Sequence, residues 1–212
     1  GKPLVYLDSA NSSQKPKMVI DKISNFYETE FSNVGRSVHT LAVKATNRFE
    51  ATRDKVQKYL NAKHREEIIF TKGATEAINL VASSYGKKYI NKGDEILITE
   101  LEHHSNYVPW NFLRTEKGAI IKFAQVNESG DVEIEEIKKL ITNKTKMIAI
   151  THISNVTGAV LPITKIVDLA KEKNIPVLID GTQGAPHSKI DMQKIGCDFY
   201  AISCHKMYGP TG

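Results

Sequence analysis

The chain has 212 residues, of which 41% are hydrophobic and 25% are charged, a composition typical of a folded globular protein rather than a disordered or fibrous one. No apolar run approaches the roughly 20 residues of a membrane-spanning helix. The net charge of +5 comes with only five arginines and no basic stripe interleaved with aromatic residues, so we expect neither nucleic acid nor membrane as a partner. Two cysteines, Cys197 and Cys204, cannot build a disulfide framework.

The first part of the chain is predicted to be helical. Residues 17–31 place apolar side chains at helical spacing, and residues 42–60 form a second long helical stretch. The apolar run 68–70 is predicted to be a short strand that turns through Gly73 into a third helix, whose apolar side chains extend to Tyr85.

The rest of the chain alternates short apolar strands with amphipathic helices. The predicted strands are 96–98, 120–126, 147–150, 176–179 and 199–202, and the predicted helices are 133–141, 164–174 and, as a weaker pattern, 190–195. Such an alternation is typical of an α/β fold with a mainly parallel sheet sandwiched by helices. We therefore predict an N-terminal helical arm over residues 1–60 and a sheet domain over residues 61–212, with ligands bound outside the carboxyl ends of the strands.

An anion site is predicted where the third helix begins. Gly73 leads into Ala74 and Thr75, so the free N–H groups of the first helical turn and the Thr75 hydroxyl are available to a phosphate. The alternative is that Thr75 only caps the helix. The chain contains neither a GxxxxGK[ST] nor a GxGxxG pattern, so neither of the common nucleotide-binding loops is predicted.

An acidic residue ends the apolar strand 176–179. Asp180 follows this strand directly, and a buried carboxylate without a partner is costly. A protonated ring nitrogen on a bound cofactor would satisfy it. The alternative is that Asp180 caps the turn formed by Gly181–Gln183.

A lysine and a histidine stand at two further strand ends. Lys206 comes four residues after residue 202, beside Ser203 and His205, and a lysine with a lowered pKa there can form a Schiff base; the alternative is a lysine that reaches for solvent. His103 follows the strand 96–98, and without HxxxH or CxxC spacing we predict no metal site. We interpret His103 as a flat ring packed on a cofactor or as an acid–base group, rather than as a metal ligand. Together with the phosphate site and Asp180, these residues point to pyridoxal 5'-phosphate.

The chain resembles the SUF-type (group II) cysteine desulfurases over all 212 residues. The segments that carry the resemblance are Tyr6–Ala10, Arg36–Leu41, Lys72–Asn79, Glu102–Asn106, Ser154–Gly158, Asp180–Gln183 and His205–Gly212. This family belongs to the fold-type I, class V aminotransferase group of pyridoxal-phosphate enzymes and includes selenocysteine lyases. The resemblance implies that residues 61–212 form an incomplete large domain of that fold.

The resemblance also implies roles around the cofactor. Lys206 is similar to the lysine that holds pyridoxal phosphate and later moves the substrate's α-proton. Asp180 is similar to the residue paired with the pyridine nitrogen, Gln183 to the one that contacts the phenolic oxygen of the ring, and His103 to the histidine stacked on the ring. The residues that resemble the phosphate-binding set are the backbone of Ala74, Thr75, Ser203 and His205.

Two residues resemble groups on the substrate side. Asn155 is similar to a residue near the substrate carboxylate and the ring oxygen, and His39 lies in a segment similar to the one that covers the mouth of the active site. The implied reaction converts L-cysteine, or L-selenocysteine in the lyases, to L-alanine and leaves the sulfur as a persulfide. The implied setting is a homodimer that passes sulfur to an acceptor protein of iron–sulfur cluster assembly. Its location would be the bacterial cytoplasm or, for a eukaryotic source, a plastid-type organelle.

The chain departs from the family pattern at three points. Cys204 stands where the family usually has a small residue, and Ala74 stands where it usually has threonine. The family continues for roughly as many residues again, so we expect this chain to be the N-terminal half. The persulfide-forming cysteine, the substrate-binding arginine and the small C-terminal domain would then lie beyond Gly212, and the 212 residues alone would be inactive. The alternative from another class is a non-catalytic binding module, against which the joint presence of Lys206, Asp180 and His103 speaks.

Overall fold

The computed structural model describes residues 1–211, so Gly212, the end of the predicted 61–212 domain, lies outside the described residues. The chain divides into two compact units. We call residues 1–70, 189–193 and 204–211 the helical unit, and residues 71–188 and 194–203 the sheet unit. No helix within residues 1–211 is long and apolar enough to cross a membrane.

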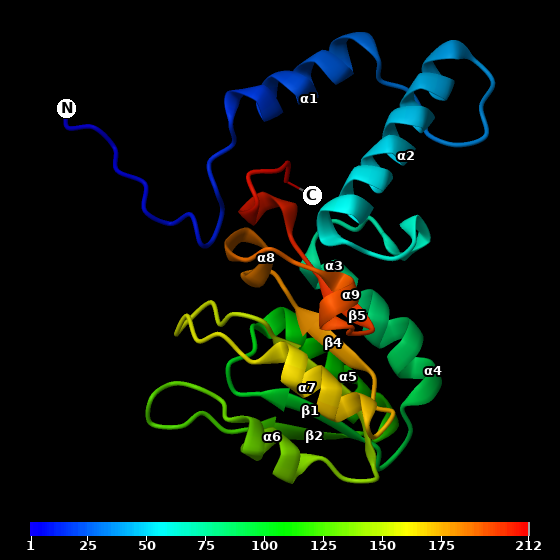
Figure 1. Ribbon diagram of the computed structural model, residues 1–212. Helices are drawn as coiled ribbons and strands as arrows, with labels where there is room; N and C mark the ends of the chain where they lie inside the picture. The colour runs from blue at the N-terminus through cyan, green and yellow to red at the C-terminus, as the bar shows by residue number, and fades with distance from the viewer. Residues whose placement is uncertain (212) are drawn as a thin grey trace. The chain divides into compact units, whose positions relative to one another are not determined.

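The sheet unit contains a five-stranded sheet in the order β2-β1-β3-β4-β5, and every neighbouring pair of strands is parallel (Figure 1). The strands are β1 (Glu95–Thr99), β2 (Ile120–Ala124), β3 (Thr145–Thr151), β4 (Val177–Asp180) and β5 (Phe199–Ala201). The predicted parallel α/β sheet is confirmed. The strand order turns around at β1, which has β2 on one side and β3 on the other, and ligands of such sheets bind outside the carboxyl ends at this kind of switch point.

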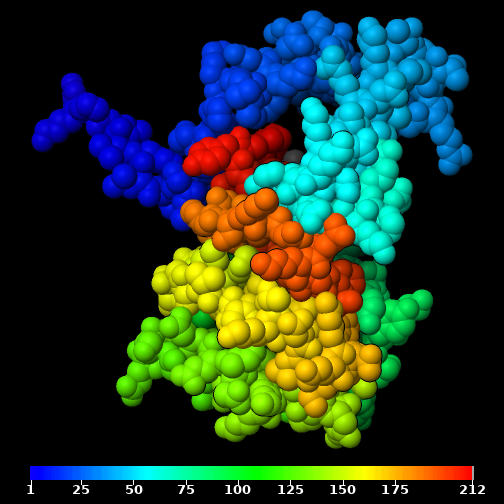
Figure 2. Space-filling view, in the orientation of Figure 1, coloured from blue at the N-terminus to red at the C-terminus, as the bar shows by residue number. Residues whose placement is uncertain are grey.

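Helices cover both faces of the sheet. The helices of the sheet unit are α3 (Ala74–Val81), α4 (Lys87–Tyr89), α5 (Val108–Lys117), α6 (Ile134–Leu140), α7 (Ile163–Lys171) and α8 (Gly184–His187). The helical unit contains α1 (Lys17–Thr29) and α2 (Thr40–Leu60), and α9 (Met192–Ile195) has residues in both units. Ile96 and Ile98 pack with Ile78 of α3 and Trp110 of α5 in one buried cluster. Since side chains alternate along a strand, Leu97 points to the opposite layer. There α6 and α7 lie on the near side of the sheet and form part of the face seen in the space-filling view (Figures 1 and 2).

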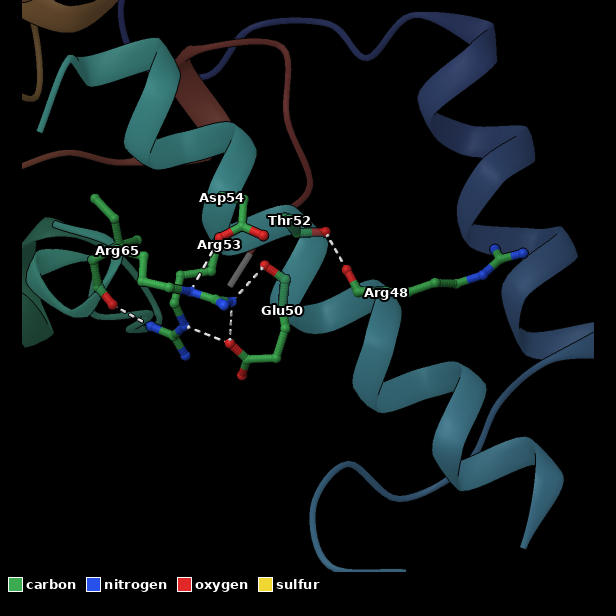
Figure 3. A network of polar contacts seen from close by, with 7 residues as sticks. Arg48, Glu50, Thr52, Arg53, Asp54 and Arg65 are labelled. Carbon is green, nitrogen blue, oxygen red and sulfur yellow. Dashed lines mark hydrogen bonds and ion pairs between the residues drawn. The ribbon is translucent and has the colours of Figure 1, made fainter. Parts of the chain in front are cut away.

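The helical unit contains the two long helices that the sequence predicts over residues 17–31 and 42–60, now bounded as α1 and α2. Polar contacts tie the turn at Arg65 to α2 (Figure 3). The Arg65 guanidinium lies 2.8 Å from the Glu50 carboxylate and 3.0 Å from that of Asp54, and Arg53 lies 3.2 Å from Glu50. These ion pairs are partly exposed to solvent, so each stabilises the fold by no more than about 1 kcal/mol.

The predicted strand at residues 68–70 is wrong. These residues are extended but pair with no other strand. Phe70 instead packs edge-on against Phe49 of α2, with ring centroids 5.1 Å apart, and the Arg53 guanidinium lies 5.0 Å from the Phe70 ring. The same arginine donates a hydrogen bond to the Ile68 carbonyl. The apolar run that the sequence pattern predicts to be a strand therefore makes an aromatic and a cation–π contact instead of joining the sheet.

Candidate active site

The N-terminus of α3 forms a cradle of backbone donors. The helix begins after Gly73, whose φ of +145° is one that side chains rarely allow. The Ala74 N–H donates a hydrogen bond to the buried Ser203 hydroxyl, 2.9 Å away. The N-cap residue Gly73 offers no side chain to cap the helix, and Thr75 is exposed. The capping alternative for Thr75 is therefore not what is observed, and the first turn can receive an anion.

Asp180 ends β4 and is 3% exposed. Its Oδ1 accepts hydrogen bonds from the Thr182 N–H (3.0 Å) and the Thr182 hydroxyl (2.5 Å). The predicted alternative, in which Asp180 caps the turn that follows it, therefore applies to Oδ1. Both hydrogen bonds from Thr182 go to Oδ1, so a cationic donor would be placed at Oδ2. Gln183 follows in the same turn and is also buried.

Two aromatic rings lie against the turn that follows Asp180. The Tyr200 hydroxyl and the His152 Nδ1 are 2.8 Å apart. Burial lowers the pKa of His152 and raises the pKa of Tyr200, so both are uncharged at neutral pH. A Cβ atom added at Gly181 would lie 2.0 Å from the Tyr200 ring, and one added at Gly184 would lie 2.2 Å from the His152 Nδ1. Glycine at both positions allows the turn to approach the rings.

We expect Gly181→Ala to lower the free energy of unfolding by about 1–3 kcal/mol, because the new methyl group overlaps the Tyr200 ring. Urea unfolding followed by circular dichroism measures the change. The control is Tyr200→Ala, which removes the overlapping atoms. In that background the added methyl group should cost less than about 1 kcal/mol. An equal cost in both backgrounds would show that the ring is not what excludes a side chain at Gly181.

His103 follows β1 and caps a 3-10 turn formed by His104–Asn106. Its Nδ1 accepts a hydrogen bond from the Ser105 N–H (3.2 Å) and lies 2.7 Å from the Ser105 hydroxyl oxygen. Because Nδ1 is an acceptor, the neutral ring carries its proton on Nε2. The ring itself is exposed. It stands at the carboxyl edge of the sheet, free to lie flat on a ligand.

Sequence reasoning missed Glu102, the residue before His103. Its carboxyl group is enclosed by three donors: the Thr99 hydroxyl (2.6 Å), the Asn106 side-chain amide (2.6 Å) and the Thr151 N–H (2.9 Å). Burial raises the pKa of Glu102 to about 7, with a smaller contribution from the charge of Asp180, against the lowering effect of these hydrogen bonds. An acidic residue three positions after the end of β1 was the available signal.

Lys206 lies in the helical unit, in a 3-10 turn formed by Cys204–Lys206, and is half-buried. The N-terminal segment holds this turn. The carbonyl of His205 accepts hydrogen bonds from the Ser13 N–H (3.0 Å), the Ser13 hydroxyl (3.0 Å) and the Lys15 ammonium (2.7 Å). Burial and the neighbouring charges of Lys206 and Lys15 lower the pKa of His205. Ser13 and Lys15 were not predicted as support for the lysine turn, because they stand some 190 residues before it.

The two residues predicted on the substrate side are both exposed. His39 belongs to the helical unit and caps α2, where its Nδ1 accepts from the Ala42 N–H at 3.3 Å. Asn155 lies in the loop after β3, next to Ser154, whose hydroxyl accepts from the Val156 N–H at 3.2 Å. The structure brings Ala74 and Ser203 into contact and sets the predicted sheet-unit residues at the carboxyl edge of the sheet.

The two cysteines have different environments. Cys197 precedes β5, at the amino edge of the sheet, and burial raises its pKa to about 12. Cys204 is exposed on the lysine turn. Within residues 1–211, no group of three or more histidine, cysteine, aspartate or glutamate residues could hold a metal ion.

Comparison with known proteins identifies relatives of the whole chain. The model of the family described as "Aminotransferase class-V" matches residues 5–212. The chain is 49% identical over all 212 residues to a probable cysteine desulfurase of Halalkalibacterium halodurans and covers 52% of that protein. It is 47% identical to a probable cysteine desulfurase of Synechocystis and covers 50% of it. The chain thus spans about half the length of these relatives.

Solved structures give the same picture. The cysteine desulfurase CsdA of Escherichia coli superposes with a TM-score of 0.89 at 39% identity, over 98% of this chain and 52% of that one. The cysteine desulfurase of Thermococcus onnurineus superposes with a TM-score of 0.93 at 34% identity, again over 98% of this chain and 52% of that one. With its parallel sheet, its cradle at α3 and a family model that matches nearly its whole length, the chain belongs to the class-V aminotransferase family.

Proposed function

We propose that this chain provides the cofactor-binding part of a pyridoxal-phosphate-dependent cysteine desulfurase. One observation carries the proposal: the buried carboxylate of Asp180 and the N-terminus of α3, which Ala74 joins to Ser203, stand at the same edge of one sheet. A pyridinium nitrogen and a phosphate are the two charged groups of pyridoxal phosphate, and these two features are complementary to them. The names of the relatives support the same activity.

The residues present fit the cofactor. The first-turn N–H groups of α3, with Thr75, Ser203 and His205, would bind the phosphate. Asp180 would hold a proton on the ring nitrogen, Gln183 would donate to the ring oxygen, and His103 would cover one face of the ring. Lys206 would hold the cofactor covalently and move the substrate α-proton. When bound, pyridoxal phosphate supplies an electron sink for the substrate carbanion.

The substrate we propose is L-cysteine, with Asn155 and His39 on its side of the site. A relative that covers 98% of this chain at 29% identity is described as "SspA in complex with cysteine". We also propose a homodimer in the bacterial cytoplasm, or in a plastid-type organelle of a eukaryote. The product would be L-alanine, with the sulfur passed as a persulfide to an acceptor of iron–sulfur cluster assembly.

Sulfide release tests the proposal. The whole protein expressed from its gene should produce sulfide, with a reductant present, and alanine from L-cysteine only when pyridoxal phosphate is supplied. The 212-residue chain should release less than about 1% as much, because the Cys197 pKa of about 12 leaves almost no thiolate and Cys204 shares the turn of Lys206. A whole protein that processes only L-selenocysteine would favour the lyase. Sulfide made by the 212-residue chain at the full rate, and abolished by Cys204→Ala, would show that the nucleophile is Cys204.

A further inference from the structure

The Glu102 carboxyl group occupies the switch point of the sheet. The β1–β3 ladder extends to Leu97 opposite Ile148, two residues before β1 ends. Along β3 the N–H groups point alternately to the two neighbouring strands. The N–H of His152, directly after β3, donates to the backbone carbonyl of Asp180 on β4. The Thr151 N–H therefore points toward β1, where it meets the Glu102 Oε1 at 2.9 Å. The side chain of Glu102 thus continues the connection between the two strands.

The other oxygen of the same carboxyl group holds the turn that carries His103. Glu102 Oε2 accepts from the Asn106 Nδ2 at 2.6 Å, and the Asn106 Oδ1 accepts from the Trp110 Nε1 at 3.1 Å. Asn106 and Trp110 are both fully buried. His103 lies between two residues, Glu102 and Asn106, that are bonded to each other, and Trp110 anchors that pair in the core.

We propose that Glu102 is a positioning residue for His103: it fixes the height and direction of the imidazole by joining the ends of β1 and β3 to the turn that carries the ring. The proposal rests on the proposed function only in assigning the ring to the face of the cofactor. The exposed ring contacts Ser105 and, edge-on, the ring of His104. Both residues belong to the same turn, so the place of the ring depends on the backbone that Glu102 and Asn106 hold.

The hydrogen bonds of Glu102 survive a change in its protonation. Asp180, across β3, is the charged group that acts on it, while β1, β3 and the turn present the uncharged groups of Thr99, Thr151 and Asn106. A protonated carboxyl group can donate to the Thr99 hydroxyl oxygen, which also accepts from the Leu101 N–H. The arrangement is therefore kept when Glu102 gains or loses its proton.

The substitution Glu102→Gln tests the arrangement with little change of shape. In this variant an amide nitrogen replaces Oε2, so two hydrogen-bond donors, the Gln and Asn106 amide nitrogens, would face each other. Rotating the Asn106 amide by 180° would only move the mismatch, because its nitrogen would then face the Trp110 N–H donor. In the whole protein with bound pyridoxal phosphate we expect turnover to fall about 10–100-fold and the induced circular dichroism of the cofactor to change. The double variant Glu102→Gln/Asn106→Asp restores matched donors and acceptors and should recover most of both signals.

A double-mutant cycle separates positioning from a merely structural role. In a His103→Ala background, Glu102→Gln should change turnover and the cofactor spectrum less than about 2-fold, because the ring that it positions is gone. The matched control is Glu100→Gln, since Glu100 is an exposed glutamate of the same loop, and its effect should stay within about 2-fold. Equal losses from Glu102→Gln in both backgrounds would overturn the inference.

A cofactor-free measurement keeps the inference independent of the proposed function. In the apo protein, NMR of labelled histidines should show the His103 ring signals shifted by Glu102→Gln and restored in the double variant with Asn106→Asp. Unchanged His103 signals would overturn the inference. A wild-type protein that takes up no pyridoxal phosphate would instead overturn the proposed function, and the NMR result would still decide on Glu102.

Discussion

Lys206→Ala is expected to lower the turnover of L-cysteine by the whole protein about 10²–10⁴-fold, the usual contribution of one group that transfers a proton in the transition state. Ser13 and Lys15 hold the carbonyl of the neighbouring His205, so the turn should keep its shape when the lysine side chain is removed. Steady-state kinetics with L-cysteine measure the loss. Uptake of pyridoxal phosphate should continue, because its phosphate and ring nitrogen are proposed to bind other residues.

The covalent assignment is tested on the same lysine. Borohydride reduction of the wild-type protein followed by peptide mapping should place the pyridoxyl mass on the peptide that contains Lys206. The control is Lys189→Ala, an exposed lysine, which should leave turnover within about 2-fold. Pyridoxyl mass on Lys72 or Lys189 would rule out Lys206 as the attachment point.

Asp180→Asn is expected to lower turnover about 10–1000-fold while the fold stays intact. A carboxylate next to a cationic group typically shifts that group's pKa by about 1–3 units, which corresponds to about 1.4–4 kcal/mol and to this range in rate. An asparagine Oδ1 can still accept both hydrogen bonds from Thr182, so the turn after β4 should persist. The pH dependence of the bound cofactor's absorbance reports the loss of the proton from its ring nitrogen.

An aspartate at the other edge of the sheet provides the matched control. Asp198 accepts a hydrogen bond from the Val177 N–H, at the first residue of β4, at 2.8 Å. Asp198→Asn makes the same chemical change at the amino end of the strand and should alter turnover less than about 2-fold. If Asp180→Asn behaves like Asp198→Asn, then Asp180 is only a turn cap.

The sheet could be predicted because its central strands β1, β3 and β4 are buried on both faces. A continuous apolar run such as Ile96–Ile98 has few structural explanations other than a central parallel strand. The run 68–70 is equally apolar but pairs with no strand, and the contacts of Phe70 and Ile68 with residues of α2 explain its place. The sequence pattern of residues 68–70 alone does not indicate that Arg53 and Phe49 are the partners of this run. The helix α5 was not predicted, although Trp110 and Leu113 are spaced three residues apart.

A site residue was predictable where its polarity differs from that of the apolar strand it follows. Asp180 is such a residue, because a carboxylate that directly follows apolar residues demands a partner. Ser203 was placed by resemblance, and its contact with Ala74 spans 129 residues of sequence. Glu102 was missed because the Thr151 N–H that shows its role is 49 residues away. Local patterns indicated which edge of the sheet matters, while the contacts that hold the edge together are long-range.

The raised pKa of Cys197 has a consequence for where reactive sulfur can go. At pH 7 a thiol with a pKa of about 12 is ionised in about one molecule in 10⁵. Oxidation, alkylation and sulfur transfer all proceed through the thiolate, so Cys197 is a very poor acceptor for sulfur released nearby. A protein that handles persulfides would thereby keep the amino edge of its sheet chemically inert. A sulfur atom would then not be bound to a side chain from which no acceptor could take it.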